Sequence, residues 1–224
     1  MCYLNMMVEH PEIWHETVHI QRTAHKHVQF WNTNNFSHSI PMRGVSFKHL
    51  EEFTIEDYVS DGIMVDFANM HLGGGVLTNG AVQEEIMMMA FPEMLAARLV
   101  CPPMGDNEAI IIYGARRMVL TKGYSDGFEF VRPLKLLPRA IAEKSTIVCI
   151  DATNFKTFPS DSYQYGKKGV RRELNKAYAG FAGASYRAGE DEAVCTGKWG
   201  CGAFGGNEEM KFVIQWIACS EAER

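Results

Sequence analysis

The sequence has no CxxC pair, no long basic stretch and no apolar run approaching the roughly 18 residues of a membrane span. Without paired spacing, its six cysteines offer no metal-ligand pattern and are expected to be reduced. A net charge of −5 provides no basic face for nucleic acid, so direct DNA binding is not expected. We therefore expect no membrane association and a location in the nucleus, the cytoplasm or both.

From about residue 53, short apolar runs alternate with helical patterns, which favours a mostly parallel sheet with helices on both faces. The run Met87–Met89 is expected to fill the core. Residues 1–52 lack strong periodicity and are interpreted as an extension that precedes a domain at 53–224. The predicted strands are 62–68, 108–114, 145–152 and 193–199, and the predicted helices are 82–90, 92–100, 169–182 and 207–224.

A glycine-rich segment, GGGVLTNGAVQEE, follows the first predicted strand. Asp66 and Asn69 fall at the carboxyl end of that strand, the edge where open α/β sheets bind ligands. The three glycines 73–75 come next and suit a backbone with positive φ or in close contact with another group. For the glycines alone, a tight turn with a capping Asp is the simpler interpretation.

A second glycine-rich segment, TGKWGCGAFGGNEE, lies between the last predicted strand and the last predicted helix. Glycines at 200, 202, 205 and 206 allow backbone N–H groups to converge on a phosphate. Two such loops after two strands predict a ligand that contains a diphosphate.

Glu84 and Glu85 are adjacent at the start of a predicted helix. Adjacent helical side chains diverge by about 100°, so the two acids are expected to have different tasks. One would bind substrate while the other transfers a proton. The alternative is that both simply favour the positive N-terminus of the helix.

The segment HETVH, residues 15–19, matches the H-E-x-x-H pattern of zinc metalloproteases. His25 stands where the longer form of that pattern has its third ligand, but Arg22 replaces the glycine that turns the chain. Only 14 residues precede the motif. Chance spacing is the favoured interpretation, and no metal is expected.

The segment VDFANMHLGGGVLTNGAVQEEI resembles the signature of the poly(ADP-ribose) glycohydrolases: three glycines, a short spacer and Gln-Glu-Glu. The later RRELNKAYAGF and TGKWGCGAFGG also resemble segments of that family, so the resemblance extends over 53–224. It implies a macrodomain, with a mixed sheet between helices and an ADP-ribose cleft at strand ends. It further implies hydrolysis of ribose–ribose bonds in poly(ADP-ribose), free or on modified proteins, without a cofactor.

The resemblance also implies a role for each matching residue. Glu85 would be the catalytic acid/base, Glu84 and Asn69 would hold the ribose hydroxyls, and Asp66 would support the catalytic loop. The implied substrate-binding residues are Ile55, Glu56, Gln83 and Tyr124 at the adenine, and Gly73, Gly74, Gly75, Gly200, Cys201, Gly202, Ala203, Phe204 and Gly205 at the diphosphate.

Two departures from the family pattern leave an alternative open. Lys198 stands where the vertebrate form of the motif has Asn, which adds positive charge near the cleft. Residues 1–52 resemble only the tail of the family's helical accessory region, and a C-terminal strand with an adenine-covering aromatic is expected to be missing. The chain is therefore expected to be a hydrolase, with a catalytically weak or inactive ADP-ribose-binding macrodomain as the alternative.

Overall fold

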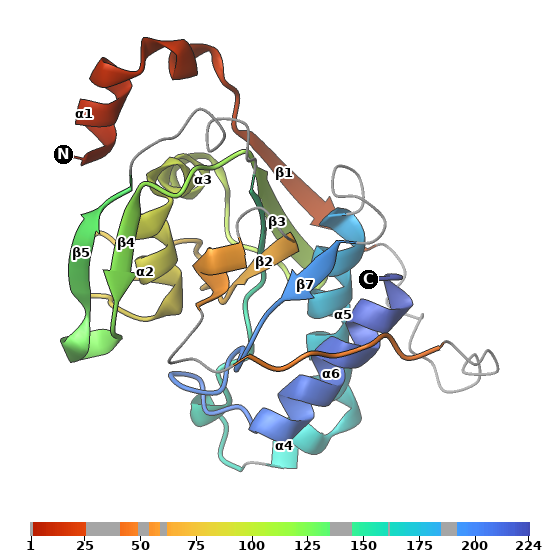
Figure 1. Cartoon of the computed structure of the whole chain (residues 1–224). Coiled ribbons are helices and arrows are strands. Elements are labelled where there is room, and N and C mark those ends of the chain that lie inside the picture. The colour runs from red at the N-terminus through yellow and green to blue at the C-terminus, as the bar shows by residue number, and fades with distance from the viewer. Residues whose placement is uncertain are drawn as a thin grey trace.

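The computed structural model describes residues 2–25, 41–48, 54–58, 62–134, 145–160, 162–184 and 192–224. A five-stranded sheet in the order β1-β3-β6-β2-β7 lies between two layers of helices (Figure 1). The predicted mixed sheet between helices is therefore confirmed. Its strands are β1 (His19–Ala24), β2 (Gly62–Asp66), β3 (Glu108–Tyr113), β6 (Thr146–Cys149) and β7 (Ala193–Cys195).

The direction of one strand, β3, differs from what the apolar runs predicted. β2 pairs in parallel with β6 and with β7, whereas β3 pairs antiparallel with both β1 and β6. Four of the five strands therefore run in the same direction, which confirms the predicted mostly parallel sheet, and among these five only β3 is reversed. β3 is covered on both faces, with five of its six residues buried. A strand buried on both faces shows no polar alternation, and its composition does not reveal its direction.

Helices cover the sheet on both faces, as Figure 1 shows. One face is covered by α2 (Gln83–Ala90), η3 (Pro92–Met94) and α3 (Leu95–Val100). The other is covered by α5 (Lys167–Ala184) and α6 (Glu208–Glu221), and the short η5 (Phe155–Thr157) and α4 (Ser162–Tyr165) precede α5. The predicted helices are thus present, with boundaries shifted by a few residues.

The central strands β2, β3 and β6 supply both cores by turning successive side chains to opposite faces. Met64 packs with Met87 and Met88 of α2, which confirms the predicted core position of these two methionines. Met89, the third residue of that run, is only half-buried. Ile63 and Val65 point to the other core, beneath α5 and α6. The sheet is therefore anchored from both sides and holds its strand ends in fixed positions.

Helix α5 approaches the sheet closely at its glycines. A Cβ on Gly180 would lie 2.5 Å from Cγ1 of Val148, and one on Gly183 would lie 2.7 Å from Cδ1 of Ile111. Larger residues there would push the helix off the sheet, which explains the small residues of AYAGFAGA.

Several elements were not predicted from the sequence. Strand β1 lies within the stretch interpreted as an extension, yet it forms the edge of the sheet beside β3. β4 (Val119–Lys122) and β5 (Glu129–Pro133) form a separate hairpin whose turn contains η4 (Ser125–Gly127). The remaining short helices are α1 (Cys2–Glu9), η1 (Pro11–His15) and η2 (Ile55–Tyr58).

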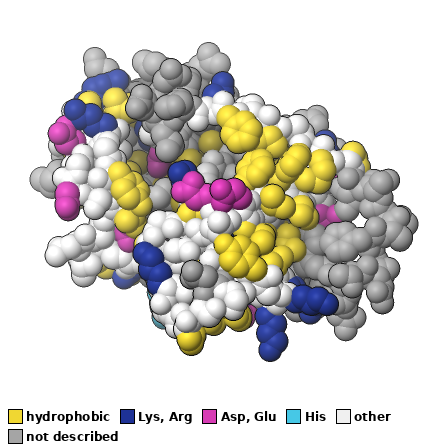
Figure 2. Space-filling view, turned by 90° about the horizontal axis from the view of Figure 1, so that it is seen from below, with side chains coloured by type: hydrophobic (Ala, Val, Ile, Leu, Met, Phe, Trp, Pro, Cys, Tyr) yellow, Lys and Arg dark blue, Asp and Glu magenta, His cyan; other side chains and the backbone are white. Residues whose placement is uncertain are grey.

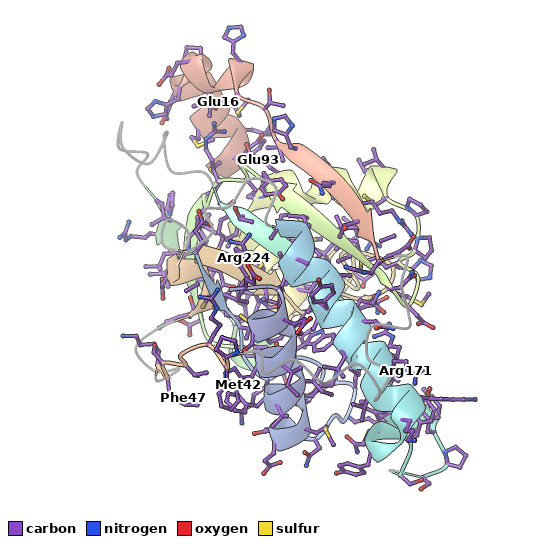
Figure 3. All side chains as sticks on the ribbon, turned by 90° about the vertical axis from the view of Figure 1, so that its right-hand side faces the viewer. Glu16, Met42, Phe47, Glu93, Arg171 and Arg224 are labelled. Carbon is purple, nitrogen blue, oxygen red and sulfur yellow. The ribbon has the colours of Figure 1, made fainter. Side chains whose placement is uncertain are left out.

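Residues 41–48 also contact the domain, where Met42 and Phe47 lie beside α6 (Figure 3). Nε1 of Trp216 donates to the carbonyl of Arg43 at 2.9 Å, and the Phe47 and Phe212 rings lie 5.8 Å apart. The predicted domain boundary at residue 52 falls outside the described residues and stays a prediction. In the part of the chain that the structure describes, no helix is long and apolar enough to cross a bilayer.

Candidate active site

Glu85 lies in the first turn of α2 and is held by the backbone on two sides. The N–H of Gly75 donates to its Oε1 at 2.8 Å, and the N–H of Val82 donates to its Oε2 at 3.0 Å. Val82 precedes the helix and has no side-chain acceptor for the free N–H groups, so Glu85 reaches back to supply one. The carboxylate is buried at the junction of the glycine turn and the helix start.

Glu84 accepts hydrogen bonds from other residues of the same turn, although its carboxyl group lies close to that of Glu85 beside Gly74. The N–H of Asn69 donates to its Oε2 at 2.9 Å, and the N–H of Gly73 donates to its Oε1. One side chain therefore ties the carboxyl end of β2 to the start of the glycine turn. The pair forms a buried acidic centre at the edge of the sheet where ligand binding was predicted.

The turn needs glycine at Gly74 and Gly80 because a side chain at these positions would collide with one or both of the two acids. Gly73 and Gly74 have φ of +92° and +43°, which a residue with a side chain rarely adopts. A Cβ on Gly74 would lie 2.6 Å from Oε1 of Glu85 and 2.8 Å from Oε2 of Glu84. A Cβ on Gly80 would lie 2.7 Å from Cδ of Glu85. The sequence predicted that glycines of this turn lie close to another group. At Gly74 and Gly80, that group is the carboxylate of Glu85 and, at Gly74, also that of Glu84.

Arg98 binds the carbonyl groups of the glycine turn. This role was not predicted from the sequence. Nη1 of Arg98 donates to the carbonyls of Leu72 at 3.0 Å and of Gly74 at 3.1 Å. A single arginine among the apolar residues of α3 was the available signal. It fixes the carbonyl side of the turn while Glu84 and Glu85 fix the N–H side.

Gln83 closes the end of β2. Its Oε1 accepts from the N–H of Phe67 at 2.7 Å, and its Nε2 donates to the carbonyl of Val65 at 3.2 Å. The sequence predicted an adenine contact for this residue but did not foresee these bonds. Its side chain is thus already oriented by the strand that it would border.

The other predicted adenine residues lie in two further segments, the β4–β5 hairpin and η2. Tyr124 lies in the turn of the β4–β5 hairpin, which is joined to the segment before α2 by the N–H of Ser125 and the carbonyl of Ala81 at 2.9 Å. Its ring is 54% exposed and free to stack. Burial and the charge of Glu85 raise the pKa of the Tyr124 hydroxyl. A hydrogen bond from the backbone of Gln83 partly offsets this rise. Ile55 and Glu56 lie in η2, with Glu56 buried.

Asp66 ends β2 with its carboxyl group fully buried, and neither oxygen has a hydrogen-bond partner within ordinary distance among the described residues. Burial, and then the charges of Glu85 and Glu56, raise the pKa of Asp66 to about 7. The neighbouring Cys149 thiol acts in the opposite direction and lowers this pKa. Burial and the charge of Asp66 raise the pKa of Glu84 to about 9. At neutral pH this centre therefore retains protons that ordinary carboxylates lose.

The buried Asp66 predicts a pH dependence of stability. Its pKa rises from an ordinary 3.8 to about 7 in the folded chain, so between these pH values the folded state binds more protons than the unfolded state. Its contribution to stability is present at pH 4 and is lost as pH rises to 7, by up to about 1.4 kcal/mol per pH unit. Asp66→Asn is expected to reduce this loss, measured by urea unfolding of both proteins at pH 4.5 and 7. Equal losses in the two proteins would contradict it.

The second glycine loop folds back on the start of α6. Gly200 has a φ of +75°, and a Cβ there would lie 2.4 Å from Cβ of Ala152. Beneath the loop, the buried Trp199 donates from Nε1 to the carbonyl of Ile150 at 2.9 Å, and Nζ of Lys211 lies 3.8 Å from the ring centroid of Trp199. The loop is therefore supported from inside by a buried aromatic residue and a buried cation, neither of which the sequence identified.

The outer part of this loop has free N–H groups. Within the described residues, those of Gly202, Ala203, Phe204 and Gly205 have no hydrogen-bond acceptor. The N–H of Cys201 is used by the carbonyl of Lys198 at 3.1 Å, so this one predicted donor is engaged. Nζ of Lys156 donates to the carbonyl of Gly202 at 3.1 Å, which places a cation against the loop. Consecutive free N–H groups beside a cation suit an anionic ligand.

Lys198 has an acidic partner at the start of α6. Its Nζ lies 2.7 Å from Oε2 of Glu208 in an exposed pair at the start of α6, so its charge is neutralised locally. We expect Lys198→Asn to change the rate of substrate turnover by no more than about threefold, because exposed pairs of this kind contribute little. Steady-state kinetics of the two proteins measures this, and a tenfold change would show that Lys198 contacts the ligand.

The HETVH segment does not form a zinc-binding helix. η1 ends at His15, Glu16 has an extended backbone, and β1 begins at His19. The two histidines therefore do not share a helical face, and Glu16 faces Arg116 at 3.6 Å beside Glu93 (Figure 3). No group of three potential metal ligands occurs among the residues that the structure describes.

The pentapeptide GYSDG, residues 123–127, matches the G-x-S-x-G of serine hydrolases in sequence alone. It lies between two antiparallel strands of a hairpin, not between a strand and a helix. Ser125 is thus a turn residue, and its φ of +52° reflects that turn.

Several known proteins are similar to this chain in sequence. Residues 28–224 match the family model described as Poly (ADP-ribose) glycohydrolase (PARG), Macro domain fold. The chain is 30% identical to poly(ADP-ribose) glycohydrolase 1 of Arabidopsis thaliana, over 90% of this chain and 47% of that protein. It is 37% identical to poly(ADP-ribose) glycohydrolase 1 of Caenorhabditis elegans, over 78% of this chain and 23% of that protein. For poly(ADP-ribose) glycohydrolase 2 of the same organism the identity is 38%, over 71% of this chain and 35% of that protein.

The chain thus spans less than half the length of each of these relatives. The part that matches the family model includes both glycine loops and the two buried acids. The chain belongs to the poly(ADP-ribose) glycohydrolase family.

Proposed function

We propose that this chain hydrolyses the ribose–ribose O-glycosidic bonds of poly(ADP-ribose) and releases ADP-ribose. The observation that carries the proposal is the pair of buried acids, Glu84 and Glu85, clamped between the glycine turn and the end of β2. Glycosidic bonds break through a transition state that resembles an oxocarbenium ion, and a positioned carboxyl group lowers that barrier by proton transfer.

In the proposed reaction Glu85 donates a proton to the leaving ribose oxygen as the bond from the anomeric carbon breaks. A water molecule then adds to that carbon and returns a proton to Glu85. One water is consumed and two hydroxyl groups form, so no cofactor is required. Glu84 and Asn69, which are joined by a hydrogen bond, would hold the hydroxyls of the ribose beside the scissile bond.

The rest of the ligand follows from the surroundings of this centre. The free N–H groups of residues 202–205 support a diphosphate site, with Lys156 nearby. The exposed ring of Tyr124 supports base stacking, and η2 with Ile55 and Glu56 would border the adenine. We propose that the substrate is poly(ADP-ribose), free or on modified proteins, and that the chain acts in the nucleus or cytoplasm.

The chemical identity of the product tests this proposal. Purified chain incubated with poly(ADP-ribose) is expected to yield free ADP-ribose, identified by mass spectrometry. Cleavage at the pyrophosphate would yield phosphoribosyl-AMP instead and would contradict the assigned bond.

A further inference from the structure

A cavity of about 460 Å³ adjoins the proposed active site. It shares Asn69 and Phe204 with that site and extends away from the acids toward α4. α4 lies at the lower edge of the molecule in Figure 1, and the view from below shows hydrophobic and acidic side chains close together on that face (Figure 2). The volume of the cavity falls within the range of small-molecule sites. The cavity is further lined by Phe158, Tyr163, Asn154, Asp106, Asp151 and Arg172.

The charges in the cavity do not favour a phosphate. Among the described lining residues, Arg172 alone carries a fixed positive charge, and three carboxylates surround it. Its guanidinium pairs with Asp151, with Glu173 at 2.9 Å and with Asp106 at 3.2 Å. Asp151 and Glu173 also pair with the buried Lys176 and Lys211, so the charges of this cluster are balanced within the protein. Arg172 therefore has no free positive charge to offer a diphosphate. A neutral portion of a ligand suits the cavity better.

Aromatic and amide groups provide contacts for such a ligand. The Phe158 and Tyr163 rings stack with centroids 4.1 Å apart and an interplanar angle of 10°, and both line the cavity. Oδ1 of Asn154 accepts from the N–H of Lys156 at 3.2 Å, while its amide nitrogen has no partner among the described residues. An aromatic wall beside a free amide suits a purine base.

We propose that this cavity holds the adenosine of the next unit of the polymer, the unit whose ribose oxygen leaves. The inference rests on the proposed function. In a ribose–ribose bond of poly(ADP-ribose) the leaving oxygen belongs to a ribose that also carries adenine. A neutral nucleoside, and not a phosphate, therefore comes directly after the scissile bond, on the side where the aromatic cavity meets Asn69.

Turnover of two substrates distinguishes binding of the next adenosine from catalysis. One is poly(ADP-ribose), and the other is an ADP-ribosyl glycoside whose leaving group is p-nitrophenol and carries no nucleoside. Tyr163→Ala is expected to lower kcat/KM for the polymer about tenfold, mainly through KM, and to leave the glycoside unchanged, because stacking on the next adenine is lost. Tyr165→Ala is the matched control, since Tyr165 lies on the same short helix with its side chain exposed outside the cavity.

Tyr163→Leu keeps an apolar side chain without the aromatic face, so it repeats the test if Tyr163→Ala unfolds. Equal losses on both substrates, or no loss on the polymer, would overturn the inference. A wild-type chain that binds ADP-ribose and cleaves neither substrate would overturn the proposed function, and the inference with it.

Discussion

Glu85→Gln is expected to lower the rate of ADP-ribose release by about a thousandfold. An amide can neither give a proton to the leaving oxygen nor take one from water. Gln also presents one acceptor oxygen where Glu85 presents two, to the N–H groups of Gly75 and Val82. One buried N–H group then lacks its acceptor, at a cost to the free energy of unfolding of about 1–3 kcal/mol.

Initial rates on poly(ADP-ribose), together with ADP-ribose binding by calorimetry, measure this effect. The variant should bind ADP-ribose while it fails to turn over polymer. Glu209→Gln is the matched control, because Glu209 also lies in the first turn of a helix but is exposed. A Glu85→Gln protein with more than a tenth of the wild-type rate would show that another group transfers the proton.

Gly74→Ala is expected to reduce activity at least about a hundredfold, because loss of alignment of a catalytic group by one ångström has effects of this size. The added Cβ would lie within 2.8 Å of oxygens of both acids, and φ at this position is +43°. Either the acids or the turn must move. The backbone strain also lowers the free energy of unfolding, by about 1–3 kcal/mol.

Thermal unfolding and initial rates of Gly74→Ala separate these two effects at a temperature where the variant is folded. Gly44→Ala is the control, since a Cβ on Gly44 meets no heavy atom within 4 Å among the described residues. Near-normal activity of Gly74→Ala would mean that the acids tolerate displacement, and the proposed geometry of the centre would be wrong.

The sequence identifies the fold where apolar patterns are strong. The core strands β2, β3 and β6 and the helices α2, α5 and α6 follow from apolar runs and helical periodicity. β1 was not found, because its HIQRTA mixes exposed and half-buried positions without regular alternation and has no buried residue. The β5 strand is exposed along its whole length, so hydrophobicity provides no signal there.

The candidate site was predictable as a set of residues, but its internal contacts were not. The spacing of the glycines and of Glu84 and Glu85 indicates that they work together. Which atoms the glycines face depends on how α2 packs against the end of β2, and that is a tertiary contact. Arg98 and Lys211 were missed for the same reason, since each supports a loop that is distant in sequence.

The rate of free ADP-ribose release from poly(ADP-ribose) by the purified chain of 224 residues tests the account most directly. The account predicts steady release that ends at free ADP-ribose, together with binding of the product. A folded chain that binds ADP-ribose but releases none would contradict it and would identify this protein as an ADP-ribose-binding macrodomain.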